Sequence, residues 1–184
     1  MLDRDAALGL LKENLHNENL INHSLAVEAI MRGLAERLGQ DVEKFGLAGL
    51  LHDIDYDQTG DDFHRHSLVA AEMLEKEGLS EDIIYAVKVH NEIHGLERKS
   101  ILDKTLYAAD PVSGFITAAA LVRPDKKLAE VQIKSLRKRF KETAFARGAS
   151  REQMDTCSEV GLEREEFLTI ALDCMKKIAD QIGL

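Results

Sequence analysis

The sequence predicts an all-α protein: a single compact helical domain over residues 1–184, with additional helices at its C-terminal end. Apolar residues recur every three or four positions along nearly the whole chain, which is the period of an amphipathic helix. Only 2 Pro and 3 Tyr occur among 184 residues, too few for the turns and β-forming side chains of a β-sandwich. Because 45% of the residues are hydrophobic, the chain can bury an ordinary core and is not disordered.

Capping and breaking residues set the limits of the helices in the first half. Asn22 is a good N-cap and Gly39 is typical of the position just beyond a helix end, so one helix should run between them. The acidic stretch DIDYDQTGDDF after His52 has the strongest break signals and should form a loop. Its aspartates are expected as loop and capping residues, or one of them could contact a functional site through water: Asp55, Asp57, Asp61 and Asp62. In order, we expect helices over about 3–16, 22–38, 41–52 and 64–77.

The second half is read in the same way. Ser80 is a cap at the start of one helix and Gly95 follows its end, while another helix starts after Ser100. That helix meets Pro111, where a backbone donor is lost. We therefore expect helices over about 80–94, from 101 to Pro111, and over 125–146, 150–160 and 163–182.

The charge distribution limits the partners. A net charge of −9 excludes a domain-wide cationic surface for duplex nucleic acid, so a small anionic, phosphorylated substrate is the expected partner. Residues 123–147 nevertheless hold nine Lys or Arg and three Asp or Glu, either as a solvated helix face or as a strip that steers phosphates. No apolar run approaches the ~20 residues of a membrane span and no targeting segment is recognisable, so a cytoplasmic location without membrane contact is expected.

The histidines are the unusual feature, with seven against six phenylalanines. Helical periodicity places His23, His52, His66 and His90 in line with apolar stripes that should face the core, and Asp110 likewise. One such histidine is usually an ordinary core residue. Five polar groups buried without partners, however, would cost about 1–3 kcal/mol each. Imidazole and carboxylate together suit a divalent transition metal, and the lack of a nearby thiolate argues against a structural zinc site.

The adjacent pair His52-Asp53 is the strongest single signal. Successive helical side chains point about 100° apart, so two neighbours can share a metal only near a helix end. The predicted break after this pair supplies such an end.

In order and context, these residues resemble the HD phosphohydrolase superfamily. Its signature is a histidine on one helix, an adjacent His-Asp on the next and a distal aspartate, which here are His23, His52-Asp53 and Asp110 in LYAADP. His66 in HRHS and His90 in VKVHNEIH resemble the dinuclear branch. The resemblance covers about residues 20–115 and implies a helical HD-domain fold, with residues 120–184 as a helical cover.

The resemblance also implies the chemistry. Family members hydrolyse phosphomonoesters, phosphodiesters and phosphoanhydrides of nucleotides and related compounds, and the layout most resembles the branch with the symmetrical diadenosine-tetraphosphate hydrolases. Ile54-Asp55-Tyr56 stands where many members have Ile-Gly-Lys, so a lysine contact to phosphate is missing. Two divalent ions are implied, of Fe, Mn, Co or Ni, with Zn or Mg as alternatives. The implied ligands are His23, His52, Asp53 and Asp110 for one ion, with Asp53 bridging to a second ion held by His66 and His90.

The expected function is a metal-dependent phosphohydrolase of a nucleotide or another small phosphorylated metabolite, with Asp53 as a catalytic residue. Cations near the motifs could bind phosphate oxygens or be ordinary surface charges. His94 could be a ligand, a substrate contact or a proton donor, or could simply favour the end of its helix. The alternatives are a catalytically quiet HD module that binds a nucleotide as a sensor, and a structural bundle with buried histidines. The candidate phosphate-binding cations are Arg65, Lys88, Arg98 and Lys104.

Overall fold

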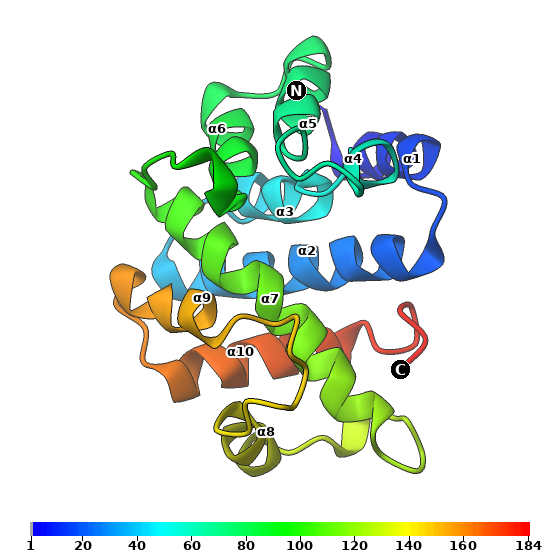
Figure 1. Ribbon diagram of the computed structural model, residues 1–184, viewed down its shortest axis with the longest axis vertical. Helices are drawn as coiled ribbons and strands as arrows, with labels where there is room; N and C mark the ends of the chain where they lie inside the picture. The colour runs from blue at the N-terminus through cyan, green and yellow to red at the C-terminus, as the bar shows by residue number, and fades with distance from the viewer. Residues whose placement is uncertain (1) are drawn as a thin grey trace.

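Two helices of 21 residues, α2 (Glu18–Leu38) and α7 (Ile101–Leu121), cross at the centre of the molecule (Figure 1). After α2 the chain reverses at Gly39, whose φ of 64° is left-handed, and α3 (Val42–Leu51) packs back along α2. A Cβ atom on Gly49 would lie 2.9 Å from the carbonyl oxygen of Val27. Glycine at this position therefore lets the two helix backbones touch.

The computed structural model describes residues 2–184. Within that range it contains helices and no β-strand, so the all-α prediction is confirmed. No helix in the described part of the chain is both long and apolar enough to cross a bilayer. The other elements are α1 (Arg4–Asn14), α4 (Tyr56–Thr59), α5 (Leu68–Lys76), α6 (Glu81–His90), η1 (Glu92–His94), η2 (Leu128–Glu130), α8 (Ile133–Phe140), α9 (Arg151–Asp155), η3 (Thr156–Val160) and α10 (Arg164–Lys177), where η marks a 3-10 helix.

The C-terminal helices complete the core. Helices α1, α3, α5 and α6 lie on one side of α2, whereas α8, α9 and α10 lie on the other (Figure 1). Helix α10 packs against both α2 and α7. Phe115 of α7 and Phe167 of α10 are fully buried in the same apolar cluster as the side chains of α2 and α3. The predicted additional C-terminal helices are therefore an integral part of the packing.

The start of α2 differs from the sequence prediction. The helix begins at Glu18, because the side chain of Asn17 caps it by accepting a hydrogen bond from the backbone N–H of Asn19. Asn22, the predicted cap, lies inside the helix, and its side-chain amide donates to the carbonyl oxygen of Ile182. The extra turn adds a tertiary contact that sequence periodicity does not show.

Several other helix ends also differ from their predicted positions. Helix α6 ends at His90 and not at residue 94, because Asn91 adopts an extended conformation before the short η1 turn. Helix α5 begins at Leu68, four residues later than expected, and α10 ends at Lys177. In the stretch 125–146 only α8 is α-helical. After α8, the Arg151 guanidinium donates to the carbonyl oxygens of residues 145, 146 and 149 and holds that segment as an ordered loop.

Helix α7 continues through Pro111 for ten more residues. Pro111 has no N–H to donate to the carbonyl oxygen of Tyr107, one turn earlier. The side-chain amide of Gln153, from α9, donates to that oxygen at 2.8 Å. Gln153 therefore replaces the missing hydrogen bond, and Asp110 stays within a regular helix.

Candidate metal centre

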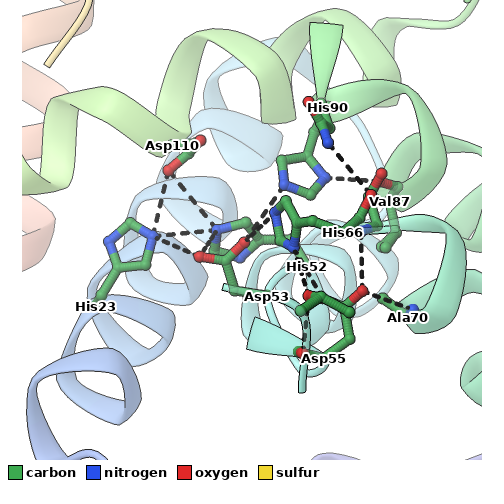
Figure 2. Close-up of polar contacts among 12 residues, drawn as sticks. His23, His52, Asp53, Asp55, His66, Ala70, Val87, His90 and Asp110 are labelled. Atoms are coloured by element: carbon green, nitrogen blue, oxygen red, sulfur yellow. Dashed lines mark hydrogen bonds and ion pairs between the residues drawn. The ribbon is translucent and has the colours of Figure 1, made fainter. Parts of the chain in front are cut away.

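Six side chains from five segments of the chain meet beside the α2–α7 crossing (Figure 2). They come from the N-terminal third of α2, the end of α3, the turn before α5, the last residue of α6 and the middle of α7. Helix α3 ends at Leu51, so the next two residues leave the helix end in different directions. The six residues are His23, His52, Asp53, His66, His90 and Asp110.

Four of these side chains form a first cluster. The Nε2 atoms of His23 and His52 lie 3.1 Å apart. The His23 Nε2 atom is 3.4 Å from Asp53 Oδ2 and 3.2 Å from Asp110 Oδ1. The His52 Nε2 atom is 3.4 Å and 3.7 Å from the same two oxygens. Ligands about 2.1 Å from a tetrahedral ion are about 3.4 Å apart, so these donors have the spacing of a metal cage.

The Asp53 carboxylate joins this cluster to a second one. Its Oδ2 atom faces His23 and His52, whereas its Oδ1 atom lies 3.3 Å from His66 Nε2 and 3.4 Å from His90 Nε2. Figure 2 shows the carboxylate between the two pairs of imidazoles. Each oxygen of the Asp53 carboxylate therefore faces a different pair of imidazoles.

The outer nitrogens of His52 and His90 face backbone carbonyl oxygens, which can only accept. The Nδ1 atom of His52 donates to the carbonyl oxygen of Gly49 at 2.8 Å, and that of His90 donates to Val87 at 2.6 Å. Since a neutral imidazole carries one proton, these bonds leave both Nε2 atoms as lone pairs. Both lone pairs point toward the Asp53 carboxylate (Figure 2).

His66 is oriented by a buried carboxylate. Its Nδ1 atom donates to Asp55 Oδ1 at 2.9 Å, while the other Asp55 oxygen accepts the backbone N–H groups of Ser67 and Ala70 at 2.8 and 3.0 Å. Ser67 has a φ of 68°, a conformation uncommon outside glycine. Asp55 thus holds a strained turn, begins α5 and sets the direction of His66.

A serine orients His23. The Ser113 hydroxyl donates to the carbonyl oxygen of Asp110 at 3.0 Å, so its oxygen accepts from the Nδ1 atom of His23 at 2.8 Å. The Nε2 atom of His23 therefore also carries a lone pair. In their neutral forms, all four imidazoles therefore direct the Nε2 lone pair toward carboxylate oxygens.

This donor set needs a cation. Without one, the carboxylates hold protons on the imidazoles instead. Burial disfavours the charged form of His23, but hydrogen bonds to Asp110 and Asp53 outweigh it and raise its pKa to about 10. Burial likewise opposes charge on His66, and Asp53 and Asp55 raise its pKa to about 10. Burial opposes ionisation of Asp53 and Asp110 too, yet the facing imidazoles lower both pKa values. The arrangement fits divalent cations, which satisfy the same lone pairs without protons.

A cleft of about 440 Å³ opens onto both clusters. None of its lining side chains in residues 2–184 is a Lys or Arg. One part is apolar and includes Phe63, which is 52% exposed. Besides five of the six clustered residues, the cleft is lined by Leu20, Tyr56, Phe63, Asn91, Glu92, Gly148 and Gln153.

The structure does not bring the predicted phosphate-binding cations into this cleft. Arg65 is exposed, and Lys88 and Lys104 are half-buried outside the lining. Arg98 pairs with Glu159 at 3.1 Å and stacks over the ring of Tyr107. Substrate binding by Arg65, Arg98 and Lys104 therefore stays a prediction that the geometry does not favour.

His94 lies just outside the lining as well. Its Nε2 atom donates to the carbonyl oxygen of His66 at 2.8 Å. The helix that was expected to carry His94 one turn beyond His90 ends at His90, so the two side chains do not share a helix face. His94 supports the turn that holds His66, and its predicted catalytic role has no geometric support.

Sequence reasoning missed three supporting residues: Asp55, Ser113 and Gln153. Asp55 looked like one of several loop aspartates, and its partners are 11 to 15 residues away in sequence. Ser113, on the turn after Asp110, had no signal beyond its position. The proline at 111 was itself a signal that some side chain must serve the freed carbonyl oxygen.

Comparison with known proteins gives a consistent result. The HD domain family model matches residues 20–114, a range that contains all six clustered side chains. Ribonuclease Y of Nitratidesulfovibrio vulgaris (strain DP4) is 37% identical over 102 residues, 53% of this chain and 18% of the relative. Ribonuclease Y of Geobacter sulfurreducens is 30% identical over 179 residues, 93% of this chain and 33% of the relative.

A third Ribonuclease Y, from Rubrobacter xylanophilus, is 28% identical over 188 residues, which cover 95% of this chain. The matches cover 18% to 34% of the length of these curated relatives, so the chain spans only about a third of them at most. The matched family, together with relatives that are named as nucleases, supports a hydrolase that binds divalent metal. With about half of its length matched by the family model, the chain belongs to the HD domain family.

Proposed function

We propose that this chain is a metal-dependent phosphohydrolase that acts on a phosphoester of the nucleotide type. One observation carries the proposal: four Nε2 lone pairs and two carboxylates converge on an open cleft, with each imidazole fixed by a partner on its outer nitrogen. Such outer partners raise the basicity of metal-binding histidines and set their orientation. A structural bundle has no need to point six acceptors at one another.

In this proposal, each of the six residues is a metal ligand. His23, His52 and Asp110 would hold one ion together with Asp53, and Asp53 would share a second ion with His66 and His90. Divalent ions bound there supply an activated water and offset charge on the phosphoryl oxygens. Asp53 is catalytic because it alone contacts both ions.

The residues that line the cleft limit the classes of substrate. No lysine or arginine of the described residues lines it, so the ions alone offset the phosphoryl charge. This favours an ester with one phosphoryl group at the ions over a polyphosphate with several charges to place. Phe63 and Tyr56 offer an aromatic side on which a nucleobase could stack. Both a nucleoside monophosphate and an RNA phosphodiester have these parts, and the names of the relatives favour the latter as a second candidate.

Metal analysis and a substrate panel test the proposal. Protein purified without chelator and reconstituted with manganese or iron should bind at least one ion per chain. It should then release product from mononucleotides, dinucleoside polyphosphates, sugar phosphates or short RNA. Asp53→Ala should abolish turnover while the helical circular dichroism persists, and Asp61→Ala, an exposed residue of the same loop, should retain it.

The outcomes separate the alternatives. Turnover that persists in Asp53→Ala refutes the assignment of the site. Metal and nucleotide binding without any turnover identifies the catalytically quiet sensor module. Less than one ion per chain after reconstitution leaves only the structural bundle.

A further inference from the structure

The basic segment of the sequence forms an ordered cationic face on α8. Lys134, Arg137, Lys138 and Lys141 follow the spacing i, i+3, i+4 and i+7, which puts all four on one side of a helix. All four are exposed. Over seven residues this face is about 10 Å long.

A groove runs beside this face. It has a volume of about 940 Å³ and lies between α8 and the start of α10. The same four basic residues line it on the α8 side, together with apolar side chains that include Phe140 and Leu168. On the α10 side it is lined by Glu163, Arg164 and Glu165, so the groove is cationic along α8 and mixed in charge along α10.

Most of this positive charge is not neutralised within the protein. Arg137 pairs with Glu165 at 3.1 Å, and both side chains are exposed. In residues 2–184, no carboxylate lies within ion-pair distance of Lys134, Lys138 or Lys141. A chain of net charge −9 thus concentrates three unpaired lysines on one helix face. Such a face attracts a narrow, extended polyanion, while the acidic rest of the protein surface repels a polyanion that is wider than the face.

The face is also connected to the metal cleft. Lys141 is the residue just after α8, and the ordered segment that follows reaches Gly148, which lines the cleft beside His23 and Asp110. Figure 1 shows this segment passing from α8 over α7 toward α9. Arg151 donates to three carbonyl oxygens of this segment and holds it between the two sites.

We propose that Lys134, Lys138 and Lys141, with Arg137, bind the phosphodiester backbone of single-stranded RNA at a site separate from the metal cleft. The choice of RNA rests on the proposed function, because a strand held along α8 could continue over the segment to the metal centre. A face of about 10 Å spans two or three phosphates of a strand. It is too short and too isolated to follow both backbones of a duplex.

Binding of a fluorescein-labelled 15-nucleotide RNA, measured by anisotropy with EDTA present so that no cleavage occurs, tests this proposal. The variant Lys134→Gln/Lys138→Gln/Lys141→Gln should bind about tenfold more weakly or worse at low salt. Its plot of log K against log salt should be less steep by about 2, since each lost phosphate contact on a single strand contributes about 0.7. The control Lys12→Gln/Lys76→Gln/Lys177→Gln changes three exposed lysines elsewhere, and should bind like the unmodified protein.

Equal affinities for the two triple variants, or equal salt slopes, would overturn the proposal. So would binding of the basic face to vesicles rich in phosphatidylserine in place of RNA. The assay needs no hydrolysis, so its result is independent of the proposed function. RNA binding that depends on the α8 lysines, without turnover of any ester, would refute the proposed function and leave this proposal standing. Turnover of mononucleotides without RNA binding by the α8 lysines would refute this proposal and leave the proposed function standing.

Discussion

Asp55 offers the sharpest test of how the site is built. Its carboxylate is fully buried and accepts three hydrogen bonds, from His66 Nδ1 and from the N–H groups of Ser67 and Ala70. In Asp55→Asn, the remaining amide oxygen can still accept the two backbone groups. The amide nitrogen must then face His66 Nδ1, and it can only donate. His66 therefore has to move its proton to Nε2, the atom that points at Asp53.

The size of the effect follows from these contacts. A hydrogen bond to a charged group contributes about 1.5–3 kcal/mol and one to a neutral group about 0.5–1.5 kcal/mol. Weakening two bonds and reversing a third should lower the free energy of unfolding of the metal-free protein by about 2–4 kcal/mol. Loss of an outer partner of a metal-binding histidine typically lowers metal affinity 10- to 100-fold, and we expect that loss at the ion held by His66 and His90.

Competition with a chromophoric chelator measures this affinity, and circular dichroism checks that the variant is folded. Asp61→Asn is the matched control, because it makes the same change at an exposed position of the same loop. We expect one class of ion to weaken in Asp55→Asn while the ion held by His23, His52 and Asp110 binds as before. Unchanged affinity at both sites, or equal loss at both, would refute the role of Asp55.

Three further outcomes are expected. In the metal-free protein, the raised pKa values of His23 and His66, about 10, stabilise the fold fully below pH 6.5, and this stability is lost as the pH rises toward 10. Urea unfolding in EDTA should show this fall, and bound metal should remove it; a flat profile in EDTA would contradict it. Phe63→Trp creates the only tryptophan of the chain, whose fluorescence AMP should quench more than ribose 5-phosphate does. The control Val122→Trp, at another exposed position, should show no difference between the two ligands. Equal quenching of the Phe63→Trp variant by AMP and by ribose 5-phosphate would exclude stacking. Gly49→Ala should lower the free energy of unfolding by about 1–3 kcal/mol in urea, because its Cβ would meet the backbone of α2, and wild-type stability would contradict that contact.

The sequence was most informative where one helix face decided the result. His23, His52 and His90 lie in line with apolar stripes, and a stripe that must be buried carries its polar members inward as well. His66 instead lies in the turn before α5, where Asp55 and not a helix face orients it. The all-α fold followed from the same periodicity. These inferences need only the positions within each helix, and they are insensitive to where the helix ends.

The errors lie where a distant side chain changes a local preference. Asn17 and Asn22 are equally good caps in isolation, and the contact of Asn22 with Ile182 is invisible in sequence. The amide of Gln153 allows a helix through Pro111, although proline alone predicts a break or kink. The cations near the motifs failed as cleft residues for a related reason: proximity in sequence to a ligand says little about which side of a turn a long side chain takes.

The two candidate ion sites share the Asp53 carboxylate, so they can be told apart only by substitutions that affect one site at a time. Asp53 contacts both, so Asp53→Ala removes a ligand from each and cannot distinguish them. Asp55 and Ser113 each orient one histidine, on opposite sides of Asp53. Ser113→Ala should therefore weaken the ion that His23 binds and leave the one that His66 binds, the reverse of Asp55→Asn. If both variants are folded and each weakens a different class of ion, two ions are bound and Asp53 bridges them. If both weaken the same ion, the centre holds one metal, and Asp53 Oδ1 accepts a proton from His66 or His90 in place of a second metal.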